Sequence, residues 1–211
     1  MLQIRQKTLQ MPFACCPLPC RKKGITVPEK TEAEFIENFL VVWNPEKGSE
    51  LYKGGFYGKP VGIPKPKIAE FDVPLILDLM EGLYLLEKER IIVLEGSERK
   101  SVGFENLRRR ARELYDEFDL KYAVYKDLRE SGLIVTPGIK YGCDFAVYKH
   151  GPGVEHAPYM VSVKKMKDEV TATEVVKAGR LATTVRKRFI IAIPEMGAKQ
   201  IQYLIFKWFK A

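Results

Sequence analysis

The spacing of apolar residues along the second half of the chain predicts helices alternating with short strands. Tyr125 and Leu128 share one helical face in a stretch that stops at Gly132, a residue typical of helix C-termini. Residues 171–188 repeat valine and leucine at helical spacing and predict a second helix. Runs of β-branched and aromatic residues predict strands at 133–135, 145–148, 158–163, 189–193 and 201–209. The last two are expected to pair around a turn at 194–199.

The first half has a more varied pattern. Thr31 and Glu34 have the spacing of a capping box and predict a short helix. Leucines 75, 79, 83 and 86 recur at helical spacing, and residues 104–115 predict another helix. The apolar content of 24–27, 39–43 and 90–94 indicates strands, whereas the Gly- and Pro-rich stretch 53–66 indicates a loop.

These elements predict a protein of the α/β (α+β) class with two domains that meet near residue 118. Residues 24–117 would form a small mixed domain that includes a linking helix, and residues 118–211 a second α/β domain. Residues 1–23 contain Pro12, Pro17 and Pro19 and show no period, so an irregular tail is expected there.

Charge and composition narrow the classes of partner. Lys plus Arg outnumber Asp plus Glu by 35 to 27, a net charge of +8 that favours polyanions such as nucleic acid, although membrane-surface proteins share it. Four arginines at 108, 109, 110 and 112 are interpreted as a solvated helix face paired with Glu113, with RNA contact as the alternative. No apolar run is long enough to span a bilayer and no secretory signal is recognised, so a cytoplasmic protein is expected. The four cysteines lack the spacing of a zinc site.

Both histidines, His150 and His156, fall in one loop-like segment between two predicted strands. Three chemistries fit this segment. A metal-dependent nuclease would use Asp144, but the next strand reads Ser162-Val-Lys164 and lacks the second carboxylate. A metal site of both histidines and Glu155 would have only two imidazoles across a Gly-Pro-Gly stretch.

The third chemistry is cleavage of RNA by its own 2'-hydroxyl, without a metal. This reaction needs a base, an acid and a fixed cation. Tyr148 ends one predicted strand, His156 precedes the next, and Lys187 lies at the end of the predicted helix. Each also has an ordinary explanation, as a strand tyrosine, a loop histidine and a cation at a helix C-terminus.

Three strings of the sequence resemble the archaeal tRNA-splicing endonuclease family. They run from Tyr125 to Tyr148, from His156 to Val161 and from Arg180 to Lys187, and the likeness covers nearly all of 118–211. Upstream, 51–60 and 81–86 are similar to the family's N-terminal domain. The resemblance implies a nuclease-like α/β domain with a mixed central sheet, behind a small mixed α/β domain.

The resemblance also implies an activity, which is the metal-independent excision of introns from pre-tRNA at bulge-helix-bulge sites. The products would carry 2',3'-cyclic phosphate and 5'-hydroxyl ends, and no cofactor would be needed. Tyr148 would be the general base, His156 the general acid and Lys187 the transition-state cation. Arg180 would stack on a bulged base of the RNA. The family's second arginine has no counterpart on the last strand, where Lys207 or Trp208 is the candidate replacement.

Members of this family act as dimers of dimers, and an acidic loop before the last strand docks into a neighbouring subunit. The corresponding turn here, Pro194-Glu-Met-Gly-Ala-Lys199, has one acidic and one basic residue. We therefore expect a heterotetramer in which a paralogous structural subunit supplies the acidic loop, with a homo-oligomer as the alternative. A non-catalytic, RNA-binding subunit of the same complex is the competing function.

Overall fold

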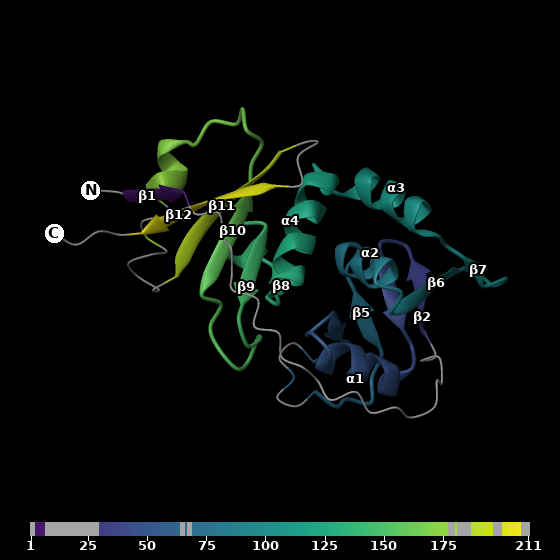
Figure 1. Cartoon of the computed structure of the whole chain (residues 1–211). Helices are drawn as coiled ribbons and strands as arrows, with labels where there is room; N and C mark the ends of the chain where they lie inside the picture. The colour runs from purple at the N-terminus through teal and green to yellow at the C-terminus, as the bar shows by residue number, and fades with distance from the viewer. Residues whose placement is uncertain are drawn as a thin grey trace, which may run out of the picture.

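Two six-stranded sheets, one built from the N-terminal half of the chain and the other mainly from the C-terminal half, lie on either side of a group of helices (Figure 1). The computed structural model describes residues 3–6, 30–63, 66, 69–176, 180, 187–195 and 200–207, and the side chains of 3–6, 206 and 207 are outside this description. The mixture of helices with two mixed sheets confirms the predicted fold class. The strand expected at 24–27 lies outside the described residues.

The N-terminal sheet has the strand order β4-β5-β3-β2-β6-β7, in which β2 and β6 are parallel and the other neighbours antiparallel. Its strands are β2 (Thr31–Ile36), β3 (Phe39–Val42), β4 (Lys59–Pro60), β5 (Leu75–Leu77), β6 (Ile91–Glu95) and β7 (Lys100–Ser101). The strands expected at 39–43 and 90–94 are confirmed. The helix expected at Thr31 is wrong, because Thr31 and Ala33 are buried on either side of exposed Glu32, which is the two-residue period of a strand.

Two helices, α1 (Pro45–Lys53) and α2 (Leu79–Glu87), pack on this sheet. The helix expected from Leu75 onward begins only at Leu79. Asp78 accepts a hydrogen bond from the Met80 amide at 2.8 Å, and Glu81 reaches back to the Asp78 amide at 3.3 Å, so a capping box fixes the start and leaves Leu75 in β5. The expected loop at 53–66 contains the short strand β4 and the last residue of α1.

The C-terminal sheet has the order β1-β12-β11-β10-β9-β8, and only β10 and β11 run parallel. Its strands are β1 (Gln3–Gln6), β8 (Ile134–Pro137), β9 (Phe145–Tyr148), β10 (Tyr159–Val163), β11 (Arg188–Pro194) and β12 (Ile201–Lys207). The five predicted strands and the pairing of the last two are confirmed. Residues 3–6, within the segment expected to be irregular, pair with β12.

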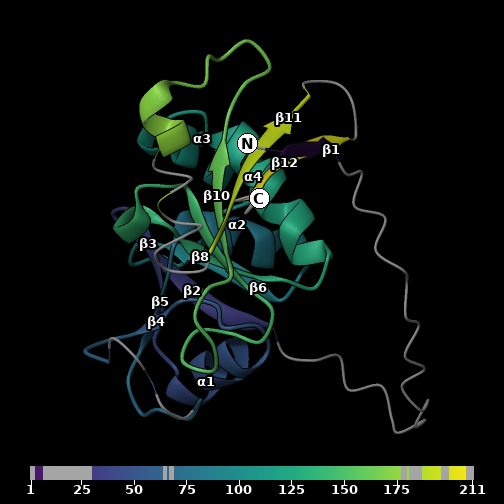
Figure 2. The same ribbon diagram turned by 90° about the vertical axis from the view of Figure 1, so that its left-hand side faces the viewer.

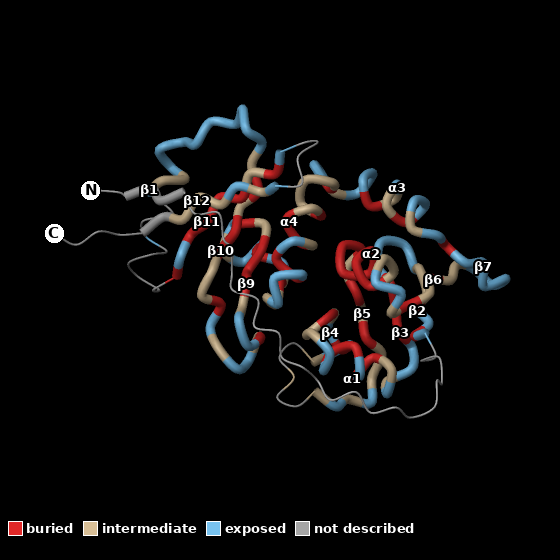
Figure 3. The backbone as a smooth tube through the Cα atoms, in the orientation of Figure 1, coloured by how far each residue is buried: buried red, intermediate tan, exposed pale blue. Residues whose placement is uncertain are grey.

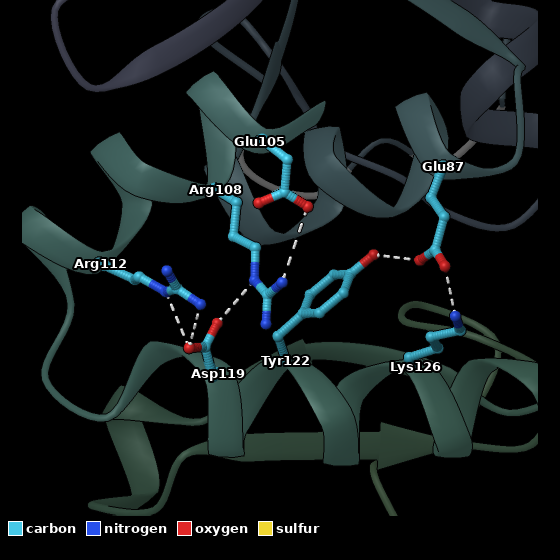
Figure 4. Close-up of polar contacts among 7 residues, drawn as sticks. All are labelled: Glu87, Glu105, Arg108, Arg112, Asp119, Tyr122 and Lys126. Atoms are coloured by element: carbon cyan, nitrogen blue, oxygen red, sulfur yellow. Dashed lines mark hydrogen bonds and ion pairs between the residues drawn. The ribbon is translucent and has the colours of Figure 1, made fainter. Parts of the chain in front are cut away.

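The helices α3 (Phe104–Leu114) and α4 (Phe118–Glu130) connect the two halves, and α4 contacts both α2 and the C-terminal sheet. Figure 4 shows how side chains tie the helices together. Tyr122 of α4 donates a 2.6 Å hydrogen bond to Glu87 of α2, and Asp119 accepts bonds of 2.8 Å from Arg108 and from Arg112. Three of the four α3 arginines thus form ion pairs with residues other than the expected partner, Glu113. Arg108 and Arg112 pair with Asp119, and Arg110 pairs with Glu95.

The largest apolar core runs from the inner face of the N-terminal sheet through α2 and α4 to the C-terminal sheet, as the buried segments in Figure 3 show. A smaller cluster, formed by Cys143, Ala146, Ala157, Met160, Phe189 and Ile191, lies apart from it. Alternate residues of a strand point to opposite faces, and Ala146 belongs to the smaller cluster whereas Phe145 and Val147 belong to the larger core. Among the described residues, no helix is long and apolar enough to cross a membrane.

Candidate active site

The pairing of three strands brings the predicted catalytic segments to one end of the C-terminal sheet. β9 is antiparallel to β10, so Tyr148 at the end of β9 lies near the beginning of β10. β10 is parallel to β11 and Tyr159 is opposite Arg188, so the residue before β11, Lys187, lies at this same end. The loop 149–158, which carries both histidines, connects β9 to β10 there. The register of the sheet therefore gathers residues that are almost forty positions apart in sequence.

Tyr148 is half-buried against the smaller apolar cluster. Burial raises the pKa of its phenol from the ordinary value, a side-chain hydrogen bond with Thr136 opposes that rise, and nearby Tyr141 and Glu155 add to it. Thr136 is itself fixed, because its hydroxyl donates to the Ala146 carbonyl at 3.2 Å. The phenol is consequently neutral near pH 7, and its phenolate is a scarce but strong base.

The loop that carries His156 is closed by Glu155. Its carboxylate accepts hydrogen bonds from the backbone amides of His150, at 2.7 Å, and of Lys149, and these bonds hold the pKa of Glu155 below its ordinary value. The Gly151 carbonyl accepts from the amide of Glu155 at 3.2 Å. His156 follows directly with an exposed side chain. The carboxylate therefore stabilises a folded loop that presents His156 to solvent.

Lys187 is buried, with 8% of its surface exposed. Its Nζ donates a 3.0 Å hydrogen bond to the carbonyl of Ala157, the residue after His156, and lies 4.6 Å from the centroid of the Tyr141 ring. The Arg188 amide donates to the Pro158 carbonyl at 2.9 Å. Lys187 and the start of β11 thus hold the segment that follows His156, and a buried ammonium is placed beside it.

The expected helix over 171–188 is wrong at its C-terminal end. Residues 172–176 and 180 are helical, but Lys187 has no helical conformation and Arg188 opens β11. Residues 177–179 and 181–186 lie outside the described residues. Lys187 reaches the site as the residue that directly precedes β11.

Arg180 and Lys207 are not among the described contacts of this cluster. Arg180 is helical and exposed, and Lys207 ends β12 with its backbone opposite Gln3 and its side chain outside the description. Trp208 lies outside the described residues.

Sequence reasoning missed Tyr141, which follows β8 in a short 3-10 turn, Ile139–Tyr141, and whose ring meets the Lys187 ammonium. An ammonium over an aromatic face is attracted by the ring electrons, more strongly where water is excluded. Nothing in the local pattern indicates this contact, because it depends on the turn folding back over the sheet.

Asp144 and Glu155, the two carboxylates that the sequence offers as metal ligands, have other partners. Asp144 accepts from the Val163 amide at 2.8 Å and pairs with Lys121 at 3.1 Å, and Glu155 holds its own loop. In the part of the chain that the structure describes, no group of three or more His, Cys, Asp or Glu residues could hold a metal ion. A hollow of roughly 660 Å³ beside α1 is lined by four carboxylates and one lysine, and this excess of negative charge disfavours a polyanion. The charged lining residues are Glu46, Glu50, Lys53, Glu70 and Asp72.

Comparison with known proteins identifies the family. A family model described as the catalytic C-terminal domain of tRNA intron endonuclease matches residues 118–203, and one described as the N-terminal domain matches residues 31–108. The chain belongs to the tRNA intron endonuclease family. The catalytic-domain match contains Tyr148, His156, Arg180 and Lys187, so the resemblance found in the sequence is confirmed at the level of the family.

Individual relatives agree with this membership of the tRNA intron endonuclease family. The tRNA-splicing endonuclease of Hyperthermus butylicus is 48% identical over 170 residues, which are 81% of this chain and 93% of the relative. The enzyme of the same name from Sulfurisphaera tokodaii is 41% identical over 178 residues, 84% of this chain and 98% of the relative. A third, from Saccharolobus islandicus strain Y.N.15.51, is 39% identical over 180 residues, 85% and 98% of the two chains.

Proposed function

We propose that this endonuclease excises introns from pre-tRNA without a metal ion, at bulge-helix-bulge sites. The observation that carries the proposal is the convergence of Tyr148, the His156 loop and buried Lys187 at one end of the catalytic-domain sheet. A phenol, an imidazole and an ammonium are the base, acid and cation that an RNA self-cleavage reaction requires.

In the proposed reaction, every bond made or broken and every proton transferred involves only the substrate and these side chains. The Tyr148 phenolate removes the proton of the 2'-hydroxyl, and the 2'-oxygen forms a bond to the adjacent phosphorus. The bond from phosphorus to the 5'-oxygen breaks, and the His156 imidazolium donates a proton to that oxygen. The products are a 2',3'-cyclic phosphate and a 5'-hydroxyl, and no oxidant or water is consumed.

Lys187 would offset the negative charge that builds on the phosphorane oxygens. Its ammonium is buried and fixed by the Ala157 carbonyl and the Tyr141 ring, so little reorganisation is needed when that charge develops. A cation that is preorganised in this way stabilises the transition state more than it stabilises the complex with ground-state RNA.

Recognition of the RNA would use residues outside this cluster. Arg180 is an exposed helical residue, and the planar guanidinium of an arginine can stack on a bulged base. We assign the second half of this clamp to Lys207, on the last strand. Replacement of Arg180 by alanine should weaken binding of RNA with a three-nucleotide bulge and leave binding of an unbulged duplex unchanged.

The assembly we propose is a heterotetramer with a paralogous structural subunit. The chain would comprise an N-terminal domain, 24–117, and a catalytic domain, 118–211, that meet near residue 118. The support is the composition of the turn 194–199, where one acid and one base leave little charge to attract a basic pocket. If the purified chain alone forms a tetramer that cuts both splice sites at full rate, the homo-oligomer is correct instead.

The test of the function is product analysis. An intron-containing pre-tRNA is incubated with the chain, alone and with a paralogous subunit, and the ends of the fragments are mapped. Cyclic phosphate and 5'-hydroxyl ends at both intron boundaries are expected. Absence of cleavage by every combination, with retained RNA binding, would identify a non-catalytic subunit.

A further inference from the structure

The active-site loop rests on the N-terminal half of the molecule. In Figures 1 and 2 the loop between β9 and β10 extends from the C-terminal sheet to the level of α1. Gly151 in this loop is buried, and a Cβ added to it would lie 2.5 Å from two ring carbons of Phe56. The loop backbone is therefore in close contact with an aromatic ring that belongs to the other half of the chain.

The Phe56 ring is held firmly from its own side. It packs edge-on against Tyr52, with ring centroids 5.3 Å apart, and the Phe56 amide donates to the Tyr52 carbonyl. Phe56 has a φ of 55°, a left-handed conformation that costs a residue with a side chain about 1 kcal/mol or more. Such a conformation persists where the surroundings fix it.

A buried arginine joins this turn to the catalytic half. Arg129 of α4, whose side chain is 3% exposed, donates to the Gly55 carbonyl at 2.7 Å and to the Val135 carbonyl at 2.9 Å. Gly55 precedes Phe56, and Val135 belongs to β8, the neighbour of β9. The ring is thus anchored to the same sheet whose loop it supports.

Hydrogen bonds within the loop connect Gly151 to the residue before His156. The Gly151 carbonyl accepts the amides of Val154 and Glu155, and the Glu155 carboxylate returns to the amides of His150 and Lys149. Because the loop is closed on itself, moving Gly151 moves Glu155 and the residue after it. The far side of His156 is held independently, by the bond from Lys187 to Ala157.

We propose that Phe56 is a positioning residue for the active site: its ring sets the position of the His156 loop, so a residue of the N-terminal half contributes to proton transfer through that loop. The proposal rests on the proposed role of His156 as the general acid. It gives Gly151 a specific function, since only a residue without a side chain fits between the loop and the ring, at a φ of 124°.

The experiment compares two substrates that differ in one atom. The first is a normal pre-tRNA, and the second has sulfur in place of the 5'-oxygen at the splice site. A thiolate departs without protonation, so the second substrate does not need the general acid. The Phe56→Ala variant should cut the normal substrate about 10- to 100-fold more slowly under single turnover, and the sulfur substrate within about threefold of wild type.

Matched variants separate positioning from folding. Gly151→Ala displaces the loop without removing the Phe56 ring. Like Phe56→Ala, it should cut the normal substrate more slowly than wild type and the sulfur substrate at nearly the wild-type rate. Phe39→Ala removes an aromatic side chain of the N-terminal half that is 50% exposed, and should leave both rates unchanged. Melting curves and RNA affinity should be near wild type for Phe39→Ala. Gly151→Ala should melt at a lower temperature, because an alanine is strained at a φ of 124° and meets the Phe56 ring, so all rates are compared below its melting transition, where its RNA affinity should be near wild type.

The rates of three variants on the two substrates distinguish a failure of the Phe56 proposal from a failure of the His156 assignment. If Phe56→Ala and Gly151→Ala are equally slow on both substrates, or lose no rate on the normal one, Phe56 does not position the acid. His156→Ala is measured alongside them. If the cleavage rate of His156→Ala returns to near wild type on the sulfur substrate but the rates of Phe56→Ala and Gly151→Ala do not, the positioning proposal alone fails. If His156→Ala does not recover, His156 is not the general acid, and the proposed function loses that assignment.

Discussion

Replacing Lys187 by methionine should slow the chemical step far more than it weakens RNA binding. Methionine keeps the length and most of the bulk of the side chain, so the variant removes the charge and leaves the packing against Tyr141 largely intact. The Lys187 side chain is almost wholly buried, and it can offer only a small surface to the ground-state RNA. The charge it supplies would matter where the phosphorane forms.

The expected magnitude follows from two losses. Removal of one fixed electrostatic donor from an active site costs about 10²- to 10³-fold in rate, roughly 3–4 kcal/mol of transition-state stabilisation. The Ala157 carbonyl would also lose its 3.0 Å partner, and an unsatisfied buried acceptor costs about 1–3 kcal/mol of folding stability. The melting temperature should therefore fall measurably, while the folded protein still binds RNA.

The assay is single-turnover cleavage of a labelled pre-tRNA at saturating enzyme, with the affinity measured separately on an uncleavable 2'-deoxy substrate. Lys140→Met, which removes an exposed lysine near the site, serves as the control for loss of charge. A fall in affinity as large as the fall in rate would mean that Lys187 is an ordinary phosphate contact. A rate equal to that of the control would remove it from the mechanism altogether.

Three further outcomes are expected. Burial raises the Tyr148 pKa, so the phenolate fraction should grow about tenfold per pH unit. With the sulfur substrate the rate should rise from about pH 6 to 9, and a pH-independent rate that Tyr148→Phe leaves unchanged would exclude the phenol as base. His156→Ala should lose about 10²- to 10⁴-fold in rate and His150→Ala little, and the reverse order would reassign the acid. Tyr141→Phe should keep the ring under Lys187 and nearly full activity, whereas Tyr141→Leu should be about tenfold slower; equal rates would show that the ring has no role.

Local pattern sufficed for the elements that frame the site. The strand 145–148 and the helix that stops before Gly132 were predicted because apolar periodicity and a C-terminal glycine act within a few residues. The capping-box pattern at Thr31 misled because the same residues also alternate in burial, and pairing with β6 decides in favour of the strand. Leu75 was assigned to a helix because its spacing fits, but the cap at Asp78 starts α2 one turn later.

The supporting residues of the site could not be predicted from local pattern. Tyr141 meets Lys187 only after a turn folds back over the sheet, and Phe56 meets Gly151 only when the two halves pack together. Long-range contacts of this kind leave no periodic signal. The candidate catalytic residues were found because histidine is rare in this chain and because the strings around it resemble a known family.

The proposed mechanism has three side chains acting on one phosphodiester without a metal ion. Its most direct test is the single-turnover rate of the assembled enzyme on an intron-containing tRNA, measured in excess EDTA and again with added Mg²⁺. Comparable rates and cyclic phosphate ends are expected in both conditions. Complete loss of cleavage in EDTA, restored only by Mg²⁺, would contradict this mechanism.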